Sequence, residues 1–355
     1  MNNIIIRPEK ESDYESLFEI KRLGWLSAYS HIFSVDAINN HFKQKKLNHK
    51  NKNINTFDDG FRFVAELNGN PVATMSIATK NSDEDFIEIL WLYVHPDCQR
   101  MGIGKQLYNF AKNIILCQNV KKIHIEALKE NFIGCSFYSK TGGKIISTRT
   151  KEMLGKTPEL VTFEFEIEPV ILETERLILR NYKETDIDDY YEYVSQKEVG
   201  PRCGWEPKSD RLQALERLKL ESQKPLQFAI VEKASNKVIG SIELMDTKYD
   251  RYPTEKADKQ TKELGFLLSE NFWGKGYMTE AAKSVLNFAF NQLNINTLYV
   301  CHAEANTQSG RVQEKLGFKV INKTPNYRTW IDGTPTDRIE RKITKSEWTK
   351  IKNTH

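Results

Sequence analysis

The sequence has no long uncharged apolar run, although 39% of its 355 residues are hydrophobic. A helix needs about 20 consecutive apolar residues to cross a bilayer, so we expect no membrane span and no membrane partner. The start, Met1–Ile4, also lacks the charged and apolar segments of a secretory signal. The length and apolar content suit two domains of ordinary size, each with its own core.

Cysteines are few, odd in number and without any C-x-x-C pair: Cys98, Cys117, Cys135, Cys203 and Cys301. This pattern predicts reduced thiols and a cytoplasmic protein, and it argues against a disulfide framework or a zinc site. No His, Cys and carboxylate cluster has metal-ligand spacing. The net charge of +4 does not favour a nucleic-acid partner, but it is compatible with an anionic cofactor.

One stretch of the chain predicts an anion-binding site. An apolar strand, Ile87–Val94, is followed by a turn that ends in Gly102-Ile103-Gly104 and by an amphipathic helix. The two glycines let the backbone fold tightly and approach a ligand closely. Because free N–H groups and the positive end of the helix dipole meet at a helix N-terminus, an anion is stabilised there.

Two familiar phosphate-binding motifs do not fit this stretch. A nucleoside-triphosphate loop requires glycine where Gln99 stands and a hydroxyl residue where Gln106 stands. A dinucleotide fingerprint requires glycine at Leu107. The remaining pattern is Q-x-x-G-x-G at a helix start, which taken alone is also compatible with an ordinary turn.

The pattern occurs twice, and so do its surroundings. Asn271–Gly276 repeats the glycine spacing after a second apolar strand. Aligning the glycines of the two stretches places Asn271 at the position of Gln99. Two further pairs of segments match: Ile6–Asp13 with Leu179–Asp186, and Asn131–Gly142 with Asn306–Gly317. Three matches in one order predict two domains of one fold, residues 1–168 and 171–352, with the boundary near Glu168-Pro169.

Several local elements follow from capping and turn residues. Ser12 and Glu15 predict a capping box for the first helix, and Thr185 is expected to cap its counterpart. A second helix is expected near Val35–Phe42, followed by a polar loop from Lys43 to Gly60. Gly200–Trp205 is expected to be a loop.

These motifs resemble those of the GCN5-related N-acetyltransferases (GNAT), which bind acetyl-coenzyme A through a Q-x-x-G-x-G loop. The second half is similar to the ribosomal-protein-alanine N-acetyltransferase branch, through Glu263–Phe266, Trp273–Ala281 and Asn306-x-x-Ser309. The resemblance covers both halves. It implies an α/β (α+β) fold: two tandem GNAT domains, each a mixed, mostly antiparallel sheet with a splayed central strand pair flanked by helices.

The resemblance also implies where acetyl-CoA is held. Backbone groups of the splayed strand bind the pantetheine arm, and the amides of the glycine loop bind the pyrophosphate. In the first domain the implied cofactor residues are Leu92, Tyr93, Val94, Gln99, Arg100, Met101, Gly102, Ile103, Gly104, Lys105 and Asn131. In the second they are Gly265, Phe266, Leu267, Asn271, Trp273, Gly274, Lys275, Gly276, Tyr277, Thr279, Asn306 and Ser309.

Acetyl transfer from a thioester benefits from an acid that protonates the leaving thiolate. Tyr138 stands where the family often places this acid; it is also compatible with a packed aromatic beside Phe137. Gln313 stands at the matching position of the second domain and cannot act as an acid. The resemblance offers Ser309 as its substitute.

A base is needed to deprotonate the ammonium form of the acceptor. The family often uses a carboxylate on the splayed strand, so Glu88 and Glu263 are the candidates, and each could equally be a solvated strand residue. His95, next to Pro96, is better explained as a surface or capping residue. Trp25 and Tyr29 are candidates for the acceptor wall, with a core role as the alternative.

The resemblance therefore implies an acetyl-CoA-dependent N-acetyltransferase. Its acceptor is a primary amine, either a small molecule or a protein N-terminus, which attacks the thioester directly. An alternative is that one domain is catalytic and the other is a cofactor-sensing or substrate-binding module, with the second domain as the candidate because of Gln313. The protein is expected to be a monomer or a homodimer.

Overall fold

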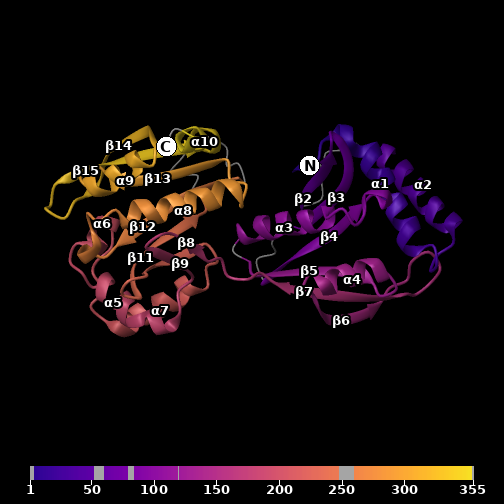
Figure 1. Cartoon of the computed structure of the whole chain (residues 1–355), viewed down its shortest axis with the longest axis horizontal. Coiled ribbons are helices and arrows are strands. Elements are labelled where there is room, and N and C mark those ends of the chain that lie inside the picture. The colour runs from indigo at the N-terminus through magenta and orange to yellow at the C-terminus, as the bar shows by residue number, and fades with distance from the viewer. Residues whose placement is uncertain (1–3, 52–59, 79–83, 119, 248–259, 354–355) are drawn as a thin grey trace. The chain divides into compact units, whose positions relative to one another are not determined.

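The computed structural model describes residues 4–51, 60–78, 84–118, 120–247 and 260–353. The chain divides into two compact units, Met1–Glu168 and Pro169–His355, each of which contains one sheet and its helices (Figure 1).

The first unit is built on a seven-stranded sheet in the order β1-β2-β3-β4-β5-β7-β6. Its strands are β1 (Ile4–Pro8), β2 (Gly60–Leu67), β3 (Asn70–Ala78), β4 (Phe86–Val94), β5 (Lys122–Leu128), β6 (Lys144–Thr150) and β7 (Glu159–Glu166). Its helices are α1 (Tyr14–Tyr29), α2 (Val35–Asn51), α3 (Ile103–Leu116) and α4 (Phe132–Lys140).

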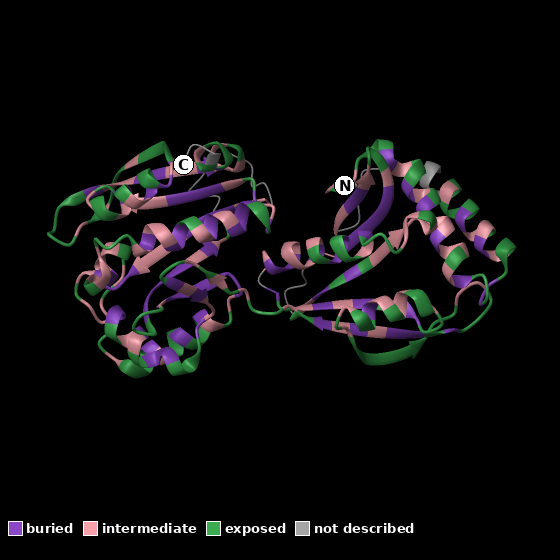
Figure 2. Cartoon of the chain, viewed as in Figure 1, coloured by how far each residue is buried: buried purple, intermediate pink, exposed green. Residues whose placement is uncertain are grey.

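Helices cover both faces of this sheet. The apolar stripe of α3, including Leu107 and Ala111, packs on the sheet in the largest core cluster of the unit. On the other face Leu17 and Ile20 of α1 pack on Val64 and Tyr93. Burial follows these contacts, because the central strands and inner helix faces are buried whereas the edge strand β6 is exposed throughout (Figure 2).

The second unit repeats this plan with an eight-stranded sheet, β14-β15-β13-β12-β11-β10-β9-β8. Its strands are β8 (Leu172–Glu173), β9 (Leu177–Arg180), β10 (Gln227–Glu232), β11 (Lys237–Met245), β12 (Thr261–Leu268), β13 (Thr297–Ala303), β14 (Lys319–Thr329) and β15 (Pro335–Thr344). Its helices are α5 (Ile187–Val194), α6 (Val199–Cys203), α7 (Arg211–Ser222), α8 (Tyr277–Asn291), α9 (Thr307–Lys315) and α10 (Lys345–Asn353).

Each sheet has one parallel strand pair at its centre, and this pair splays. β4 pairs with β5 only over Phe86–Glu88, and β12 pairs with β13 only over Thr261–Glu263. Beyond these residues the strands separate, while the other neighbouring strands described pair antiparallel. The predicted fold, two mixed and mostly antiparallel sheets flanked by helices, is confirmed.

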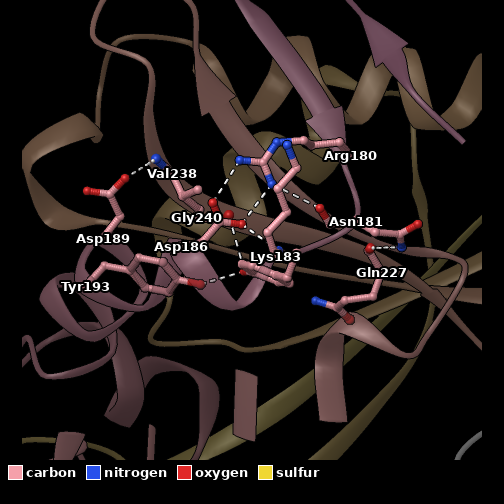
Figure 3. A network of polar contacts seen from close by, with 10 residues as sticks. Arg180, Asn181, Lys183, Asp186, Asp189, Tyr193, Gln227, Val238 and Gly240 are labelled. Atoms are coloured by element: carbon pink, nitrogen blue, oxygen red, sulfur yellow. Dashed lines mark hydrogen bonds and ion pairs between the residues drawn. The ribbon is translucent and has the colours of Figure 1, made fainter. Parts of the chain in front are cut away.

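The first repeated segment forms the same partly buried ion pair in both units. Arg7 donates to both oxygens of Asp13 at 2.7 and 2.8 Å, and Arg180 donates to both oxygens of Asp186 at 2.8 Å. Figure 3 shows the second pair, with Asp186 also accepting the backbone N–H of Lys183. A bidentate ion pair of this kind fixes where the first helix starts against the first strand.

The predicted caps of these helices are wrong. Asp13, not Ser12 with Glu15, accepts the N–H of Lys10 at 2.8 Å. Asp186, not Thr185, does the same in the second unit. In both units a 3₁₀ turn precedes the helix, so the capping carboxylate lies one residue later than the predicted hydroxyl.

Other expectations about local structure need correction. α2 continues to Asn51, so the first part of the expected Lys43–Gly60 loop is helical, and residues 52–59 lie outside the described residues. The first part of the expected loop at Gly200–Trp205 belongs to the short helix α6. α10 was not expected. None of the described helices combines the length and apolar character that a bilayer crossing requires.

Candidate functional site

The first splay opens into a cavity of about 520 Å³. One wall is β4 from Ile89 to Val94, one end is the glycine turn and the start of α3, and the far wall is α4. The α1 residues Gly24, Ser27, Ala28 and Tyr29 close the side opposite α3. The cavity therefore connects the glycine turn to the face of the sheet covered by α1.

The second splay opens into a similar cavity of about 380 Å³. It is lined by Phe266–Leu268 of β12, by the turn into α8, and by α9 residues that include Ser309. α6 contributes Val199, Arg202 and Cys203. The two cavities occupy the same place in the two folds.

The two central strands are not built alike. β4 carries a β-bulge, because Ser76 of β3 lies opposite Trp91 whereas the next residue, Ile77, lies opposite Ile89, which leaves Leu90 as the extra residue. β12 runs in continuous register with β11 from Glu263 to Leu268. A bulge therefore accompanies the splay in the first domain, and the second domain splays without one at this pair.

The glycine turns have the same conformation but different glycines. Gly102 is the N-cap of α3 with φ 82°, and Gly276 is the N-cap of α8 with φ 80°. Two residues earlier, Arg100 (φ 62°) occupies the left-handed conformation that Gly274 (φ 74°) occupies in the second domain. The pairing by sequence is thus off by two residues: Gln99 corresponds to Trp273, and Gly102 to Gly276.

The turns fit a pyrophosphate. The carbonyl of Gly102 accepts the N–H of Gln106, and that of Gly276 accepts the N–H of Glu280, so each preceding run of amides points out of the helix end. Among the described residues no heavy atom lies within 4 Å of the place where a Cβ of Gly102 or Gly274 would be. Arg100 and Lys105 line the first cavity, and Arg202, Arg311 and Lys315 line the second, adding positive charge.

Most of the cofactor residues implied by the sequence line the cavities. Met101, Gly265, Asn271 and Lys275 do not. Asn131 and Asn306 line them as N-caps of α4 and α9, where their side-chain oxygens accept the N–H of Gly134 and Ser309. Sequence reasoning missed Phe137 and Lys140 in the first cavity and Arg202 and Lys315 in the second, since no motif carries them.

Tyr138 lines the first cavity and is only 8% exposed. Its ring packs on Phe163 and Phe165. Burial raises the pKa of Tyr138 above its ordinary value, with smaller contributions from Tyr93 and Cys135. The phenol therefore keeps its proton at neutral pH, which is the state an acid must have.

Gln313 occupies the corresponding place on α9 and is fully buried. Its Nε2 donates to Ser309 Oγ at 3.1 Å. Because that bond uses a lone pair of Ser309, the hydroxyl proton stays available for the cavity that Ser309 lines. Behind Gln313, burial lowers the pKa of His302 to about 4, so this imidazole is neutral.

The two predicted bases lie on the paired part of their strands. Glu88 is exposed opposite His124, and Glu263 is buried opposite Tyr299. Neither lines a cavity. Glu263 Oε1 lies 3.5 Å from Cys301 Sγ. His95, by contrast, accepts the N–H of Asp97 as the N-cap of a short turn.

The aromatic residues of α1 differ in position. Tyr29 lines the cavity, and its hydroxyl accepts the side-chain N–H of Asn131 at 3.2 Å. Trp25 does not line it, but donates to the hydroxyl of Tyr93 at 2.9 Å. Tyr29 therefore lies at the cavity wall, and Trp25 lies behind it.

Models of known families match both units. The acetyltransferase (GNAT) family matches residues 23–143, and the acetyltransferase (GNAT) domain matches residues 176–319. The chain belongs to the GNAT acetyltransferases. It is an N-acetyltransferase with two tandem GNAT domains, and acetyl-CoA is the cofactor of this family.

The individual relatives named here each cover between 41% and 50% of this chain. The uncharacterized N-acetyltransferase p20 of Bacillus licheniformis is 29% identical over 155 residues, 42% of this chain and 82% of the relative. Spermidine N(1)-acetyltransferase of Thermoplasma acidophilum is 28% identical over 153 residues, 41% of this chain and 91% of the relative. The ribosomal-protein-S5-alanine acetyltransferase structure from Vibrio fischeri has a TM-score of 0.39 at 22% identity, covering 50% of this chain and 98% of that one.

Proposed function

We propose that each of the two GNAT domains binds acetyl-CoA in its own splay cavity and transfers the acetyl group to a primary amine. The observation that carries this proposal is that both central strand pairs separate into a cavity that ends at a left-handed glycine and a helix N-terminus. When bound, acetyl-CoA supplies an acetyl group activated as a thioester. The boundary between the domains lies near Glu168-Pro169.

The chain's own residues supply binding and proton transfer. The loop amides of Gln99–Gly104 and Trp273–Met278 hold the diphosphate, and the exposed edges of β4 and β12 orient the pantetheine arm. Tyr138 in the first domain and Ser309 in the second line their cavities and each carry a hydroxyl proton to donate. The amine is deprotonated by a carboxylate and attacks the thioester directly.

The acceptor is a small amine or a protein N-terminus. Two relatives support these classes by their names: one acetylates spermidine, and the other is a ribosomal-protein-S5-alanine acetyltransferase. We therefore choose spermidine and an unblocked alanine-initiated peptide as the first acceptors to assay.

The test uses two blocking variants of the full chain. Gly104→Trp fills the first cavity, since a Cβ there meets only ordinary contacts at 3.7 Å or more. Thr279→Trp fills the second cavity from the first turn of α8. Calorimetry should show two acetyl-CoA sites in the wild type and one in each variant, and thiol release with amine should continue in each.

The result decides between two active domains and the alternative of one active domain beside a binding module. Gln313 favours one active domain beside a binding module, because it stands at the position of Tyr138 and its amide cannot act as a proton-donating acid. If Gly104→Trp binds acetyl-CoA but releases no thiol with either amine, the second domain is a binding module. If the wild type binds no acetyl-CoA, the proposal fails.

A further inference from the structure

A carboxylate that no motif points to lies beside the splayed strand of the second domain. Glu243 on β11 is in register with Gly265 on β12, and Gly265 immediately precedes Phe266, the first β12 residue that lines the cavity. A Cβ at Gly265 would lie 2.8 Å from Cε of Met245 and 3.3 Å from both Cγ and Oε1 of Glu243. Gly265 does not have a positive φ, so the absence of a side chain here is explained by the room it leaves for Met245 and for the carboxylate of Glu243.

The surroundings of Glu243 are polar and well defined. Lys224 Nζ lies 3.6 Å from Glu243 and 2.9 Å from Glu221. With its nitrogen toward the two carboxylates, the amide of Gln227 donates to both. Figure 3 shows Asn181 donating to the carbonyl of Gln227 at 2.9 Å, and a second bond of 2.9 Å to Lys224 fixes the same turn.

Two acids therefore share one lysine and one amide. Burial raises the pKa of Glu243 and Glu221 raises it further, against the opposing effect of Lys224 and Arg217. Glu243 is not itself among the residues that line the cavity, but its side chain is 24% exposed, so it is accessible from solvent next to the strand that does. A carboxylate in this setting is a stronger base than an ordinary surface glutamate.

The same place in the first domain is built from other residues. There Ser76 lies opposite Trp91. Ser76 occupies the position of Glu243, and Trp91 occupies the position of Gly265. Lys21 Nζ lies 4.1 Å from the centre of the Trp91 ring. A carboxylate in the second domain is thus matched by a small hydroxyl and an aromatic ring with a cation.

We propose that Glu243 is the general base of the second domain and binds the ammonium group of its acceptor. This rests on the proposed function. Glu243 takes one proton from the ammonium, and the neutral nitrogen then forms a bond to the acetyl carbon as the carbon–sulfur bond breaks. Ser309 passes its proton to the sulfur and regains one from the amine, while Glu243 returns its proton to water.

The test uses the Gly104→Trp chain, in which only the second cavity takes acetyl-CoA, with spermidine and the alanine-initiated peptide as acceptors. Glu243→Gln keeps the size of the side chain and removes its basicity. We expect kcat/KM to fall about 100-fold with unchanged acetyl-CoA binding. Glu216→Gln, the same change at an exposed position of α7, is the matched control and should have no effect.

The pH profile separates a base from a structural residue. Activity should fall as the pH drops through the pKa of Glu243, and Glu243→Gln should abolish this limb. Glu221→Gln should move this acid limb to lower pH, because it removes a like charge that raises the pKa of Glu243. Lys224 and Arg217, which lower that pKa, remain in this variant. An unchanged kcat/KM and an unchanged pH profile in Glu243→Gln overturn the assignment. So does a loss of activity that occurs in Glu263→Gln, the candidate from the sequence, and not in Glu243→Gln. A Gly104→Trp chain that binds acetyl-CoA but turns over neither amine refutes the second domain's proposed activity and this role together.

Discussion

The two domains share a cofactor frame and differ on the face where an acceptor is expected. Both have the Arg–Asp pair, the left-handed N-cap glycine and the asparagine cap of the helix at the far cavity wall, α4 or α9. They differ at Tyr138 and Gln313 and at Trp91 and Gly265. The backbone of the glycine turn and of the helix caps is preserved between the copies, whereas the bulge of β4 and the side chains around the proposed reacting group are not.

The largest expected effect concerns the acid. In the Thr279→Trp chain, Tyr138→Phe should lower kcat of the first domain about 100-fold, because the ring stays packed and only the proton is lost. The raised pKa of Tyr138 predicts that this residue causes no alkaline loss of activity below about pH 10. In the Gly104→Trp chain, Gln313→Leu should cost about tenfold, since Ser309 loses its partner. Steady-state thiol release measures both, and equal small effects would contradict the assignment of different acids.

The second comparison concerns the shared ion pair. Asp186→Asn should destabilise the second domain by about 3 kcal/mol, because Arg180 keeps only the carbonyl of Asn181 as a bonded partner among those described. Asp13→Asn should cost less, about 2 kcal/mol, because Arg7 still donates to Glu66 at 2.8 Å. Hydrogen exchange in β1 and β9 reports each domain separately. An equal loss in both would show that Glu66 contributes nothing.

The pair with Arg7 also predicts an acid dependence. The hydrogen bond from Arg7 lowers the pKa of Asp13, so its stabilisation is present above the ordinary aspartate pKa and is lost as the pH falls below about 4. Asp13→Asn should remove this dependence from the exchange rates of β1. A wild type and variant with parallel acid profiles would contradict it.

The third comparison concerns the cation on Trp91. Burial lowers the pKa of Lys21 to about 8. Lys21 follows Asp13 by eight positions in the sequence, and the residue eight positions after Asp186 in the second domain is the uncharged Val194. Relative to Lys21→Met, the wild type should gain about 2 kcal/mol between pH 8 and pH 10, because the unfolded lysine still binds a proton there. Urea denaturation at both pH values measures this. A constant difference would mean that Lys21 is solvated.

The smallest effect concerns the turn. Arg100 adopts a left-handed conformation that glycine adopts more easily. Arg100→Gly should therefore be neutral or stabilise by up to about 1 kcal/mol, and Gly274→Ala should destabilise by about 1 kcal/mol. Thermal unfolding and acetyl-CoA affinity should be measured together, since Arg100 also lines the cavity. Destabilisation by Arg100→Gly would show that contacts of the Arg100 side chain stabilise the turn by more than its left-handed backbone conformation costs.

The sequence by itself determined the repeat, the family and the place of both cofactor turns, because glycine spacing, apolar strands and amphipathic helices are local patterns that the fold preserves. It did not determine the register of the second turn, since Arg100 stands where the other copy has Gly274 and only the backbone dihedral angles show it. It placed the caps one residue early, because Asp13 and Asp186 are selected by an arginine on a neighbouring strand. The sequence did not indicate Glu243 for the same physical reason. The residues around its carboxylate come from β10, β12 and α7, which only the tertiary structure brings together.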